Sequence, residues 1–333
     1  MISKKRRWVA VTATDDFPVS MKPVREALRG IAPVRTIPLP FSPITSAEEK
    51  KIAKLLQGAA GMLLRPGYIT PTLLDLLPDL KIIAMHGVGV DQIDVEACTE
   101  RGVLVTNAPG ANADSVAELT LGLMIGIARQ VPQSAWRVHN EKVWGEARHT
   151  GSELRGKTLG LVAVGQIGRR VAHLCKAFGM KVCGYDPGLT AKDIRAQGVR
   201  PVKLDALLAG SDYVSLHAPL TPATHHLIDR KAIAKMKKGA ILINAARGPL
   251  VDENALARAL KSGRLGGAAL DVLEGEPPDP KSPIFDAPNI LLTPHMAGST
   301  DECLDRIAGT AAMDIGRFLQ SKRPKYRVNR PRR

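Results

Sequence analysis

Residues 159–168 have the sequence LGLVAVGQIG, in which an apolar run ends at Val164 and glycines follow at positions 165 and 168. The run predicts a buried strand, and the glycines predict a tight turn that opens a helix. Free backbone N–H groups and the positive end of a helix dipole bind phosphate, and Gly165 lets the backbone approach it. Gly168 lets the helix pack closely on the strand. The stretch therefore predicts a parallel α/β sheet with a dinucleotide pyrophosphate at the turn.

The next predicted strand ends in an acidic residue that complements this turn. Asp186 follows the run KVCGY, about 20 residues beyond the turn, where dinucleotide-binding folds place an acid. Such a carboxylate accepts hydrogen bonds from both ribose hydroxyls and repels a 2′-phosphate, and no arginine follows directly. Ala163 replaces the first glycine of the G-x-G-x-x-G fingerprint, and an ordinary turn with an exposed aspartate is the alternative. The combination predicts NAD, rather than NADP, as the cofactor.

On both sides of this stretch, short apolar runs alternate with segments of helical spacing. The predicted strands of the first series are 8–13, 34–37, 61–64, 81–85 and 103–106, and those of the second are 159–164, 181–186, 213–217, 240–244, 268–272 and 290–293. The predicted helices are 21–29, 47–56, 72–77, 92–101, 112–128, 167–178, 231–236, 253–261 and 301–319. The runs are continuously apolar, as strands covered by helices on both faces require.

These elements predict two α/β units with doubly wound parallel sheets. The helix at 112–128 has Asp114 or Ser115 as a cap, with Glu118 completing a capping box, and residues 136–155 are predicted to be irregular. The last helix is long enough to return to the first series. We therefore expect a Rossmann nucleotide-binding domain at residues 108–299. A smaller, flavodoxin-like substrate-binding domain is expected from both chain ends, residues 1–107 and 300–333.

Composition excludes several other classes of protein. The chain has 333 residues, 44% hydrophobic and 24% charged, which suits a two-domain globular protein. No apolar run reaches the roughly 18 residues of a membrane-spanning helix, and the run after the basic start is too short for a signal peptide. Four cysteines, Cys98, Cys175, Cys183 and Cys303, form no C-x-x-C pair and are predicted to be buried in a reducing compartment. We expect a cytoplasmic protein.

Positive charge is concentrated at the two ends of the chain. The net charge is +15, of which residues 1–14 supply four cations and residues 317–333 supply eight, without any acid in either segment. A nucleic-acid surface is expected instead as a basic patch on the folded body, interleaved with aromatic residues. The sequence therefore predicts solvated basic tails and no nucleic-acid partner.

Three ionisable residues follow predicted strands of the second series, at the edge where open α/β sheets bind ligands: Arg247, Glu276 and His295. Reduction of a 2-oxo acid needs a cation for the carboxylate and carbonyl, a proton donor, and a partner for that donor. Arginine, histidine and a carboxylate supply these functions in turn, and Asp271 could bind the nicotinamide carboxamide. Singly, each has an ordinary explanation as a loop cation, a turn residue or a satisfied polar group. Together, behind a nucleotide turn, they predict a dehydrogenase.

Motifs along nearly the whole chain resemble one family. They are GVGVDQID at 87–94, RGV at 101–103, NAPGAN at 107–112, SVAE at 115–118, ELRGKTLG at 153–160, HAPLT at 217–221, NAARG at 244–248, ALDV at 269–272, EP at 276–277 and TPH at 293–295. The sequence resembles the D-isomer-specific 2-hydroxyacid dehydrogenases, which include D-3-phosphoglycerate dehydrogenases and glyoxylate/hydroxypyruvate reductases.

This resemblance implies roles for particular residues. Arg247, Glu276 and His295 would be catalytic, and the substrate carboxylate would be held by backbone N–H groups around His86, Gly87, Val88 and Gly89. The residues expected to contact the cofactor are Gly165, Gln166, Ile167, Gly168, Asp186, His217, Ala218, Pro219, Ala245, Ala246, Asp271 and Gly298. The family is typically homodimeric through its nucleotide domain, and the helix at 115–128 would serve that contact here.

Met85 is the departure from the family pattern that bears on the substrate, because several relatives carry a cation there. It favours a small, singly charged 2-oxo acid such as glyoxylate or hydroxypyruvate, whereas Arg65 could compensate for the missing cation. A D-3-phosphoglycerate dehydrogenase, an NAD-sensing regulatory protein of the same fold, and a dehydrogenase of formate or phosphite are the alternatives. The pair His225-His226 is not expected to form a metal site, and no regulatory domain is expected after the last helix.

Overall fold

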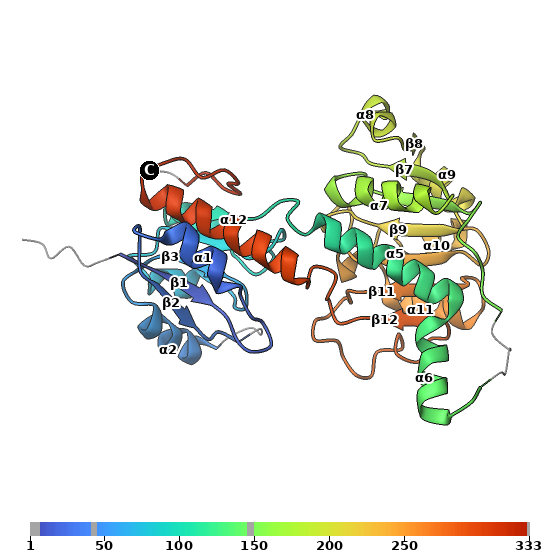
Figure 1. The fold of residues 1–333 in the computed structure, drawn as a ribbon, viewed down its shortest axis with the longest axis horizontal. Helices are drawn as coiled ribbons and strands as arrows, with labels where there is room; N and C mark the ends of the chain where they lie inside the picture. Colours follow the sequence, from blue (N-terminus) through green and yellow to red (C-terminus); the bar gives the residue numbers. More distant parts are fainter. Residues whose placement is uncertain (1–6, 41–44, 145–149, 332–333) are drawn as a thin grey trace, which may run out of the picture. The chain divides into compact units, whose positions relative to one another are not determined.

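The structure is a computed structural model, and it describes residues 7–40, 45–144 and 150–331. The chain divides into two compact units, each with a parallel sheet (Figure 1). The discontinuous unit consists of Met1–Asn112 and Ser299–Arg333, and the central unit is Ala113–Gly298. Lys4, Lys5, Arg6, Arg332 and Arg333 of the predicted basic tails, and residues 145–149 of the predicted irregular stretch, lie outside the described residues.

The discontinuous unit is built on a five-stranded parallel sheet in the order β2-β1-β3-β4-β5. Its strands are β1 (Trp8–Thr12), β2 (Val34–Ile37), β3 (Ala59–Leu64), β4 (Ile82–Met85) and β5 (Leu104–Thr106). Its helices are α1 (Met21–Leu28), α2 (Ser46–Leu56), α3 (Pro71–Asp75), α4 (Val95–Glu100) and α12 (Asp301–Leu319). β1 and β3 are buried along their whole length, as their unbroken apolar sequences require.

Two apolar layers cover the faces of this sheet. One layer joins alternate strand residues such as Val9 and Leu63 to α1 and α12, which pack against each other. The other joins Ala10 and Met62 to α2, α3 and α4. Successive side chains of a strand point to opposite faces, so each strand contributes to both layers. The carboxyl ends of β3 and β4 are thereby held side by side, because Leu64 pairs with Met85.

The central unit has a seven-stranded parallel sheet in the order β12-β11-β10-β9-β6-β7-β8. Its strands are β6 (Thr158–Val162), β7 (Lys181–Tyr185), β8 (Arg200–Pro201), β9 (Tyr213–Leu216), β10 (Ile241–Asn244), β11 (Gly267–Leu270) and β12 (Ile290–Leu292). Its helices are α5 (Ala113–Arg129), α6 (Val131–Glu141), α7 (Gln166–Ala177), α8 (Ala191–Ala196), α9 (Leu204–Gly210), α10 (Arg230–Lys235) and α11 (Glu253–Lys261), with a 3-10 turn at Gly248–Leu250. Helices α5 and α7 pack on one face, and α9, α10 and α11 pack on the other.

Two parallel-sheet α/β units confirm the predicted fold class, while several local predictions are wrong. Residues 131–141 of the chain form helix α6, although most of that segment was expected to be irregular. Gln130 has a left-handed backbone (φ 51°) and Pro132 follows, so α5 ends and a separate helix begins. Helix α5 begins at Ala113, so Asp114 and Ser115 lie inside its first turn instead of capping it.

Other differences are smaller. The helices α8 and α9 were not predicted, and α4 begins only after Asp94, whose side chain accepts a hydrogen bond from Ala97 N at 2.8 Å. All four cysteine side chains are buried, as predicted. Within the described residues, no helix combines the length and the apolar character needed to cross a membrane.

Candidate active site

The glycine-rich turn of the central unit lies between β6 and α7. Gly165 is the N-cap of α7, and a Cβ atom placed on it would meet no protein atom within 4 Å. By contrast, a Cβ on Gly168 would collide with the carbonyl oxygen of Ala163, so Gly168 is needed for the close packing of the helix on the turn. Ala163 itself has φ 71°, a conformation that glycine adopts without cost. The space above Gly165 is therefore open toward the helix N-terminus.

Asp186 lies directly after β7 and is tied to this turn. Its Oδ2 accepts a hydrogen bond from Val164 N at 2.9 Å, and its Oδ1 accepts one from Gly188 N at 2.8 Å. A carboxylate has about four lone-pair sites, so two of them remain for further donors. The half-buried carboxylate can therefore still accept bonds from the hydroxyls of a ribose.

His217 provides a second indication of a ligand beside the turn. Burial lowers its pKa to about 4, so the ring is neutral near pH 7. Its Nε2 lies 3.0 Å from Ser215 Oγ, while its buried Nδ1 has no partner among the described residues. Because a buried polar atom without a hydrogen bond is costly, the orphaned nitrogen fits a site completed by a ligand. Together with the open space above Gly165, it shows that the residues present fit a dinucleotide.

The remaining predicted cofactor residues follow neighbouring strands of the same sheet. Ala218 and Pro219 come after β9, Ala245 and Ala246 after β10, and Asp271 after β11. Gln166 and Ile167 form the first turn of α7, and Gly298 lies beyond β12. The sheet thus places the whole predicted set along its carboxyl edge, while their contact with a cofactor stays a prediction.

His295 and Glu276 form a direct pair at this edge. The His295 Nδ1 lies 2.6 Å from Glu276 Oε2, and the half-exposed ring keeps its Nε2 side available. The hydrogen bond from Glu276 raises the pKa of His295 above its ordinary value, which burial and the charge of Arg247 oppose. Leu273 N donates to Glu276 Oε1 at 3.3 Å, which helps to fix the carboxylate. The arrangement can hold an imidazolium ready to give a proton.

Arg247 is positioned by a buried amide that sequence reasoning missed. Asn244, at the end of β10, donates from Nδ2 to Arg247 O at 2.9 Å and accepts from Ala246 N at 3.0 Å through Oδ1. Arg247 Nη1 donates to Ala246 O at 2.7 Å. An asparagine at a strand end before a loop cation was the available signal, since Asn244 is only 1% exposed.

Asp271 holds the segment that carries His295. Its Oδ1 accepts from Thr293 Oγ1 at 2.6 Å and from Met296 N at 2.9 Å, and its Oδ2 accepts from Ala297 N at 2.8 Å. His295 N in turn donates to Asp271 O at 2.8 Å. The nearly inaccessible carboxylate therefore fixes the backbone on both sides of His295. Its expected contact with nicotinamide stays a prediction.

In the discontinuous unit, Arg65 and His86 follow the paired strands β3 and β4. Burial lowers the pKa of Arg65, and burial together with the Arg65 charge lowers the pKa of His86 to about 3. Arg65 Nη1 and His86 Nε2 are both buried without a hydrogen-bond partner among the described residues. An anion at this edge would supply the partner that the guanidinium lacks.

The glycine-rich segment after His86 presents backbone donors. Asn107 Nδ2 donates to Val88 O at 2.7 Å, and Ala108 N donates to Gly87 O at 2.8 Å. Within the described chain, the N–H groups of Gly87, Val88 and Gly89 have no acceptor. These groups can bind a carboxylate, as the sequence predicts, although no ligand contact tests this.

Three potential metal ligands also meet in the central unit. Nitrogen and oxygen atoms of His225, His226 and Glu274 lie within 4.8 Å of one another, and His226 Nε2 is 2.6 Å from Glu274 Oε1. The ion pair accounts for two of the three groups, and the absence of a metal site stays a prediction.

Comparison with known proteins identifies the family. A model described as the NAD-binding domain of the D-isomer specific 2-hydroxyacid dehydrogenases matches residues 121–297. The chain belongs to this family. The matched residues include the glycine-rich turn, and the description of the domain as NAD-binding agrees with the geometry of that turn.

Individual relatives extend the similarity beyond that domain. The chain is 42% identical over 290 residues to the D-3-phosphoglycerate dehydrogenase of Methanocaldococcus jannaschii, covering 86% of this chain and 55% of that protein. A Thermus thermophilus protein of known structure has a TM-score of 0.85 and 36% identity, covering 96% of this chain and 99% of the other. A glyoxylate reductase from Paecilomyes thermophila has a TM-score of 0.82 and 30% identity, covering 97% and 98%. The chain spans about half the length of the curated relatives that it matches.

Proposed function

We propose that the protein is an NAD-dependent dehydrogenase of a small D-2-hydroxy acid. The observation that carries the proposal is the His295–Glu276 pair at 2.6 Å, at the sheet edge that also bears Arg247 and the glycine-rich turn. The alternative of an NAD-sensing binding protein does not require this pair to act as an acid. Supporting evidence also comes from family membership.

The roles of the residues follow from their chemistry. When bound, NADH supplies the hydride that reduces the 2-oxo group. Protonated His295 gives its Nε2 proton to the oxygen of that group, and Glu276 stabilises the charged ring before the transfer. Arg247 binds the carboxylate and carbonyl oxygens of the substrate with its planar fork. In the discontinuous unit, backbone N–H groups of residues 87–89 bind a carboxylate, and in the central unit Asp186 binds the ribose.

We propose D-3-phosphoglycerate, in place of the singly charged acid favoured by the sequence, as the substrate. The buried, unpartnered Nη1 of Arg65 supports a second anionic group, because a guanidinium gains most from a phosphate or carboxylate where water is scarce. The similarity to the archaeal D-3-phosphoglycerate dehydrogenase points the same way. Glyoxylate or hydroxypyruvate is the second candidate, favoured by Met85 and by the similarity to a glyoxylate reductase.

A panel of 2-oxo acids with NADH and with NADPH, followed by the loss of reduced-cofactor absorbance, tests both levels of the proposal. We expect kcat/KM for 3-phosphohydroxypyruvate to exceed the values for hydroxypyruvate, glyoxylate and pyruvate. Arg247→Ala should lower kcat/KM for every acid, because all share the 2-oxo carboxylate. Turnover of none of them, with NADH still bound, would favour the NAD-sensing alternative.

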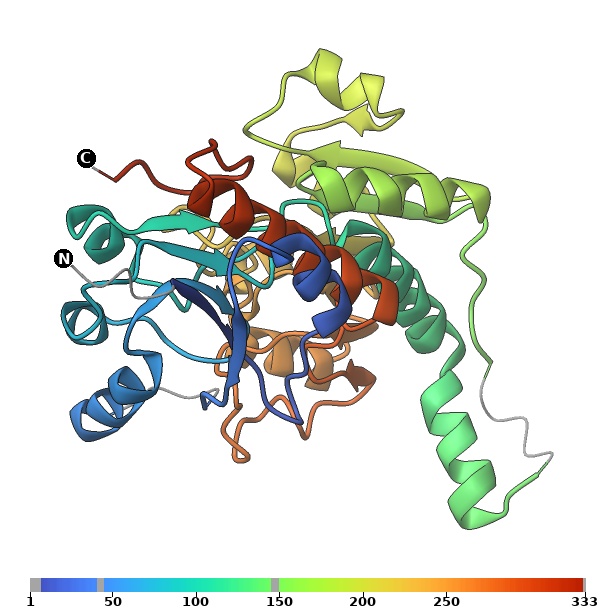
Figure 2. The ribbon, with the colours of Figure 1, turned by 60° about the vertical axis from the view of Figure 1, so that its left-hand side comes forward.

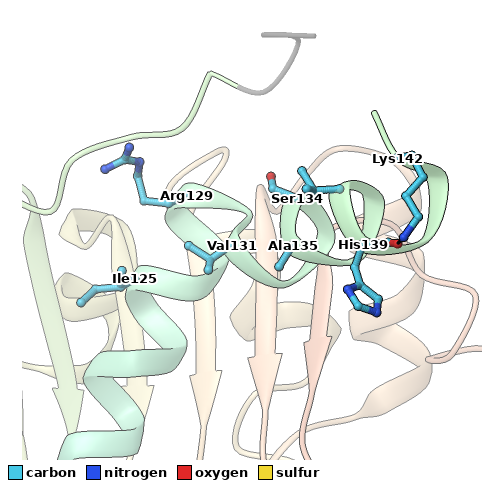
Figure 3. A pocket seen from close by; sticks show the side chains of 8 residues that line it. Ile125, Arg129, Val131, Ser134, Ala135, His139 and Lys142 are labelled. Atoms are coloured by element: carbon cyan, nitrogen blue, oxygen red, sulfur yellow. Dashed lines mark hydrogen bonds between the residues drawn. The ribbon is translucent and has the colours of Figure 1, made fainter. Parts of the chain in front are cut away.

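We also propose that the chain forms a homodimer through α5 and α6. Helix α6 contributes no buried residue, and it extends away from the sheet of the central unit (Figure 2). Val131 and Trp136 are 50% and 58% exposed. A shallow cavity of about 770 Å³ is lined by residues of both helices. Figure 3 shows Ile125 of α5 with Val131 and Ala135 of α6 among them. Val131, Ala135 and Val138 have helical spacing, so they form one apolar face that a second copy could cover.

The molar mass in solution, measured by light scattering during size-exclusion chromatography, tests the dimer. Val131→Glu together with Val138→Glu should yield monomers, since each charge would enter an apolar interface. A matched pair on α8, Lys192→Glu with Arg195→Glu, should leave the mass unchanged. A wild-type monomer at micromolar concentration would contradict the proposal.

A further inference from the structure

A large basic cavity lies at the amino ends of the strands in the discontinuous unit. Its volume is about 2230 Å³, and its lining includes the residues that precede or begin all five strands of the sheet. Arg65 and His86 follow strands β3 and β4, so they lie at the opposite, carboxyl edge of the same sheet. The cavity is therefore separate from the candidate active site and independent of the function proposed above.

One part of the cavity wall consists of cations from the first half of the unit. Arg7 precedes β1, Arg25 and Arg29 lie at the end of α1, and Lys81 precedes β4. Asp79 is the one acidic residue in the described lining. Lys81 Nζ bonds to Pro78 O at 2.9 Å, a contact that leaves its charge unbalanced.

A second part of the wall is the segment after α12, which supplies Lys322, Arg323, Arg327 and Arg330. Figure 2 shows the course of this segment in dark red, between α12 and the C-terminus. Buried polar groups fix this segment in place. The two oxygens of Asp314, which is 2% exposed, accept from Lys325 N at 2.6 Å and from Tyr326 N at 2.9 Å.

A second anchor lies farther along the segment. Asn329, 8% exposed, accepts from Val105 N at 2.8 Å and donates to Val103 O at 3.0 Å. Val328 N donates to Val105 O at 2.8 Å. The cations of residues 322–331 are thus carried by an anchored backbone segment, where the sequence predicted a solvated tail, while the side chains of Lys322, Arg323 and Arg330 are exposed to solvent.

Helix dipoles do not balance this charge. Helices α1 and α12 end at the cavity, and a helix C-terminus carries a partial charge of only about −0.5. Eight cationic side chains and one carboxylate line the cavity, so most of the positive charge lacks a counter-charge in the described lining. Like charges that are held together repel one another, so the wall favours occupation by an anion.

We propose that this cavity binds a polyphosphate chain, supplied either by inorganic polyphosphate or by a nucleoside polyphosphate. Six of the eight cations are arginines, whose forked donors match phosphate oxygens. The volume exceeds the roughly 300–1,000 Å³ of most small-ligand pockets, which suits an extended anion better than one phosphate. Phe318 is the one aromatic residue in the described lining, so the wall offers little for the stacking of bases that single-stranded nucleic acids use.

Calorimetric titration of the whole chain with tripolyphosphate, ATP and orthophosphate tests the proposal. Saturating NAD⁺ is present throughout, so that nucleotides cannot enter the dinucleotide site. We expect tripolyphosphate to bind more tightly than orthophosphate, and to weaken as salt is added. Equal affinity for ATP assigns the ligand to the phosphate chain alone, whereas clearly tighter binding of ATP assigns it to a nucleoside polyphosphate.

Two double variants probe the two parts of the wall. Arg327→Ala with Arg330→Ala, and Arg25→Ala with Arg29→Ala, should each weaken tripolyphosphate binding by about tenfold or more. Lys192→Ala with Arg195→Ala on α8 removes the same charge from the central unit and should change nothing. Arg65→Ala should also leave binding intact, which separates this cavity from the candidate active site. Circular dichroism and thermal melting confirm that each variant is folded.

Several results would overturn the proposal. They are an absence of tripolyphosphate binding near physiological salt, equal weakening in the α8 control, weakening by Arg65→Ala, or an effect confined to one part of the wall. Tighter binding of a fluorescent DNA or RNA oligonucleotide than of tripolyphosphate, lost in both wall variants, would assign the cavity to nucleic acid instead.

Discussion

The buried polar groups around His295 and Arg247 and those at the carboxyl edge of the discontinuous unit are in opposite states. In the central unit, Asp271 and Asn244 satisfy their hydrogen bonds within the protein and thereby fix His295 and Arg247. In the discontinuous unit, Arg65 Nη1 and His86 Nε2 are buried without a partner in the described structure. Satisfied networks rigidify a site, whereas orphaned groups are costly until a ligand arrives. We infer that the surroundings of His295 and Arg247 are held ready for the reaction, whereas the edge with Arg65 and His86 is ready to bind an anion.

The largest effect is expected where the central edge presents its reacting group. His295→Ala should lower kcat for reduction by about 10²–10⁴-fold, the usual contribution of a positioned acid–base group, while NADH binding stays near normal. Steady-state kinetics and a cofactor titration would measure the two quantities. A near-normal kcat in His295→Ala would show that His295 is not the proton donor.

The pH profile sharpens the same point. Because Glu276 raises the pKa of His295, the reactive protonated ring persists to higher pH, and reduction slows as pH rises through that pKa. Glu276→Gln removes the largest cause of the raised pKa, so the pH at which the reduction rate falls should become lower. Glu274→Gln on the same loop is the control, since Glu274 pairs with His226 at 2.6 Å. If the rate falls at the same pH in Glu276→Gln as in the wild type, Glu276 does not raise the pKa of the proton donor.

At the other edge, Arg65 should matter only for a substrate with a second anionic group. Arg65→Ala should lower kcat/KM for 3-phosphohydroxypyruvate by about 10–100-fold, the loss of one charge-assisted contact, and should hardly change hydroxypyruvate. Arg101→Ala is the matched control in the same unit, because that guanidinium is already bound to Asp75 at 2.7 Å. Equal losses for both acids would show that Arg65 does not read the phosphate.

The sequence predicted this chemistry better than the arrangement that supports it. Strand ends and motif positions were enough to select Arg247, Glu276, His295 and Asp186, because parallel strands bring their carboxyl ends to one edge. The supporting bonds of Asn244 depend on the path of a loop in three dimensions. Orphaned atoms such as Arg65 Nη1 likewise become visible only when every neighbour is placed.

Helix α6 and the segment after α12 show a second limit. The break between α5 and α6 depends on the left-handed backbone of Gln130, which no local pattern specifies. The charge of residues 322–331 suggested a solvated tail, yet two buried residues far apart in sequence, Asp314 and Asn329, hold it in place. Local composition does not contain such long-range contacts.

Asp186 is intermediate between the fully hydrogen-bonded Asp271 and the orphaned Arg65 Nη1, because protein donors occupy only part of the hydrogen-bonding capacity of its carboxylate. Asp186→Ala should narrow the preference for NADH over NADPH by about tenfold or more, since it removes both the ribose bonds and the repulsion of a 2′-phosphate. Dissociation constants for both cofactors would show this, measured below the melting temperature because the bond to Val164 N is also lost. Asp205→Ala, which breaks a surface pair with Lys235, serves as the control. Equal binding of both cofactors by the wild-type protein would contradict the assignment.

The smallest expected effect is on the free energy of unfolding, and it concerns the alanines that follow the first strand of each sheet. Ala163 follows β6 and Ala13 follows β1, and both are half-buried and bonded through N–H to the neighbouring strand segment. Ala163 has φ 71°, where an alanine costs about 1–2 kcal/mol, whereas Ala13 lies outside the left-handed region.

Glycine at position 163 removes the strain of the left-handed backbone, whereas glycine at position 13 only adds conformational freedom to the unfolded chain. Ala163→Gly should therefore raise the free energy of unfolding by about 0.5–1 kcal/mol, after the entropy cost of glycine is subtracted. Ala13→Gly should lower it by a similar amount, about 0.5–1 kcal/mol. Urea denaturation of both variants measures the difference, and calorimetry measures NADH affinity. If Ala163→Gly destabilises the protein as much as Ala13→Gly does, burial of the Ala163 methyl group outweighs the backbone strain, and alanine is the better residue at this turn.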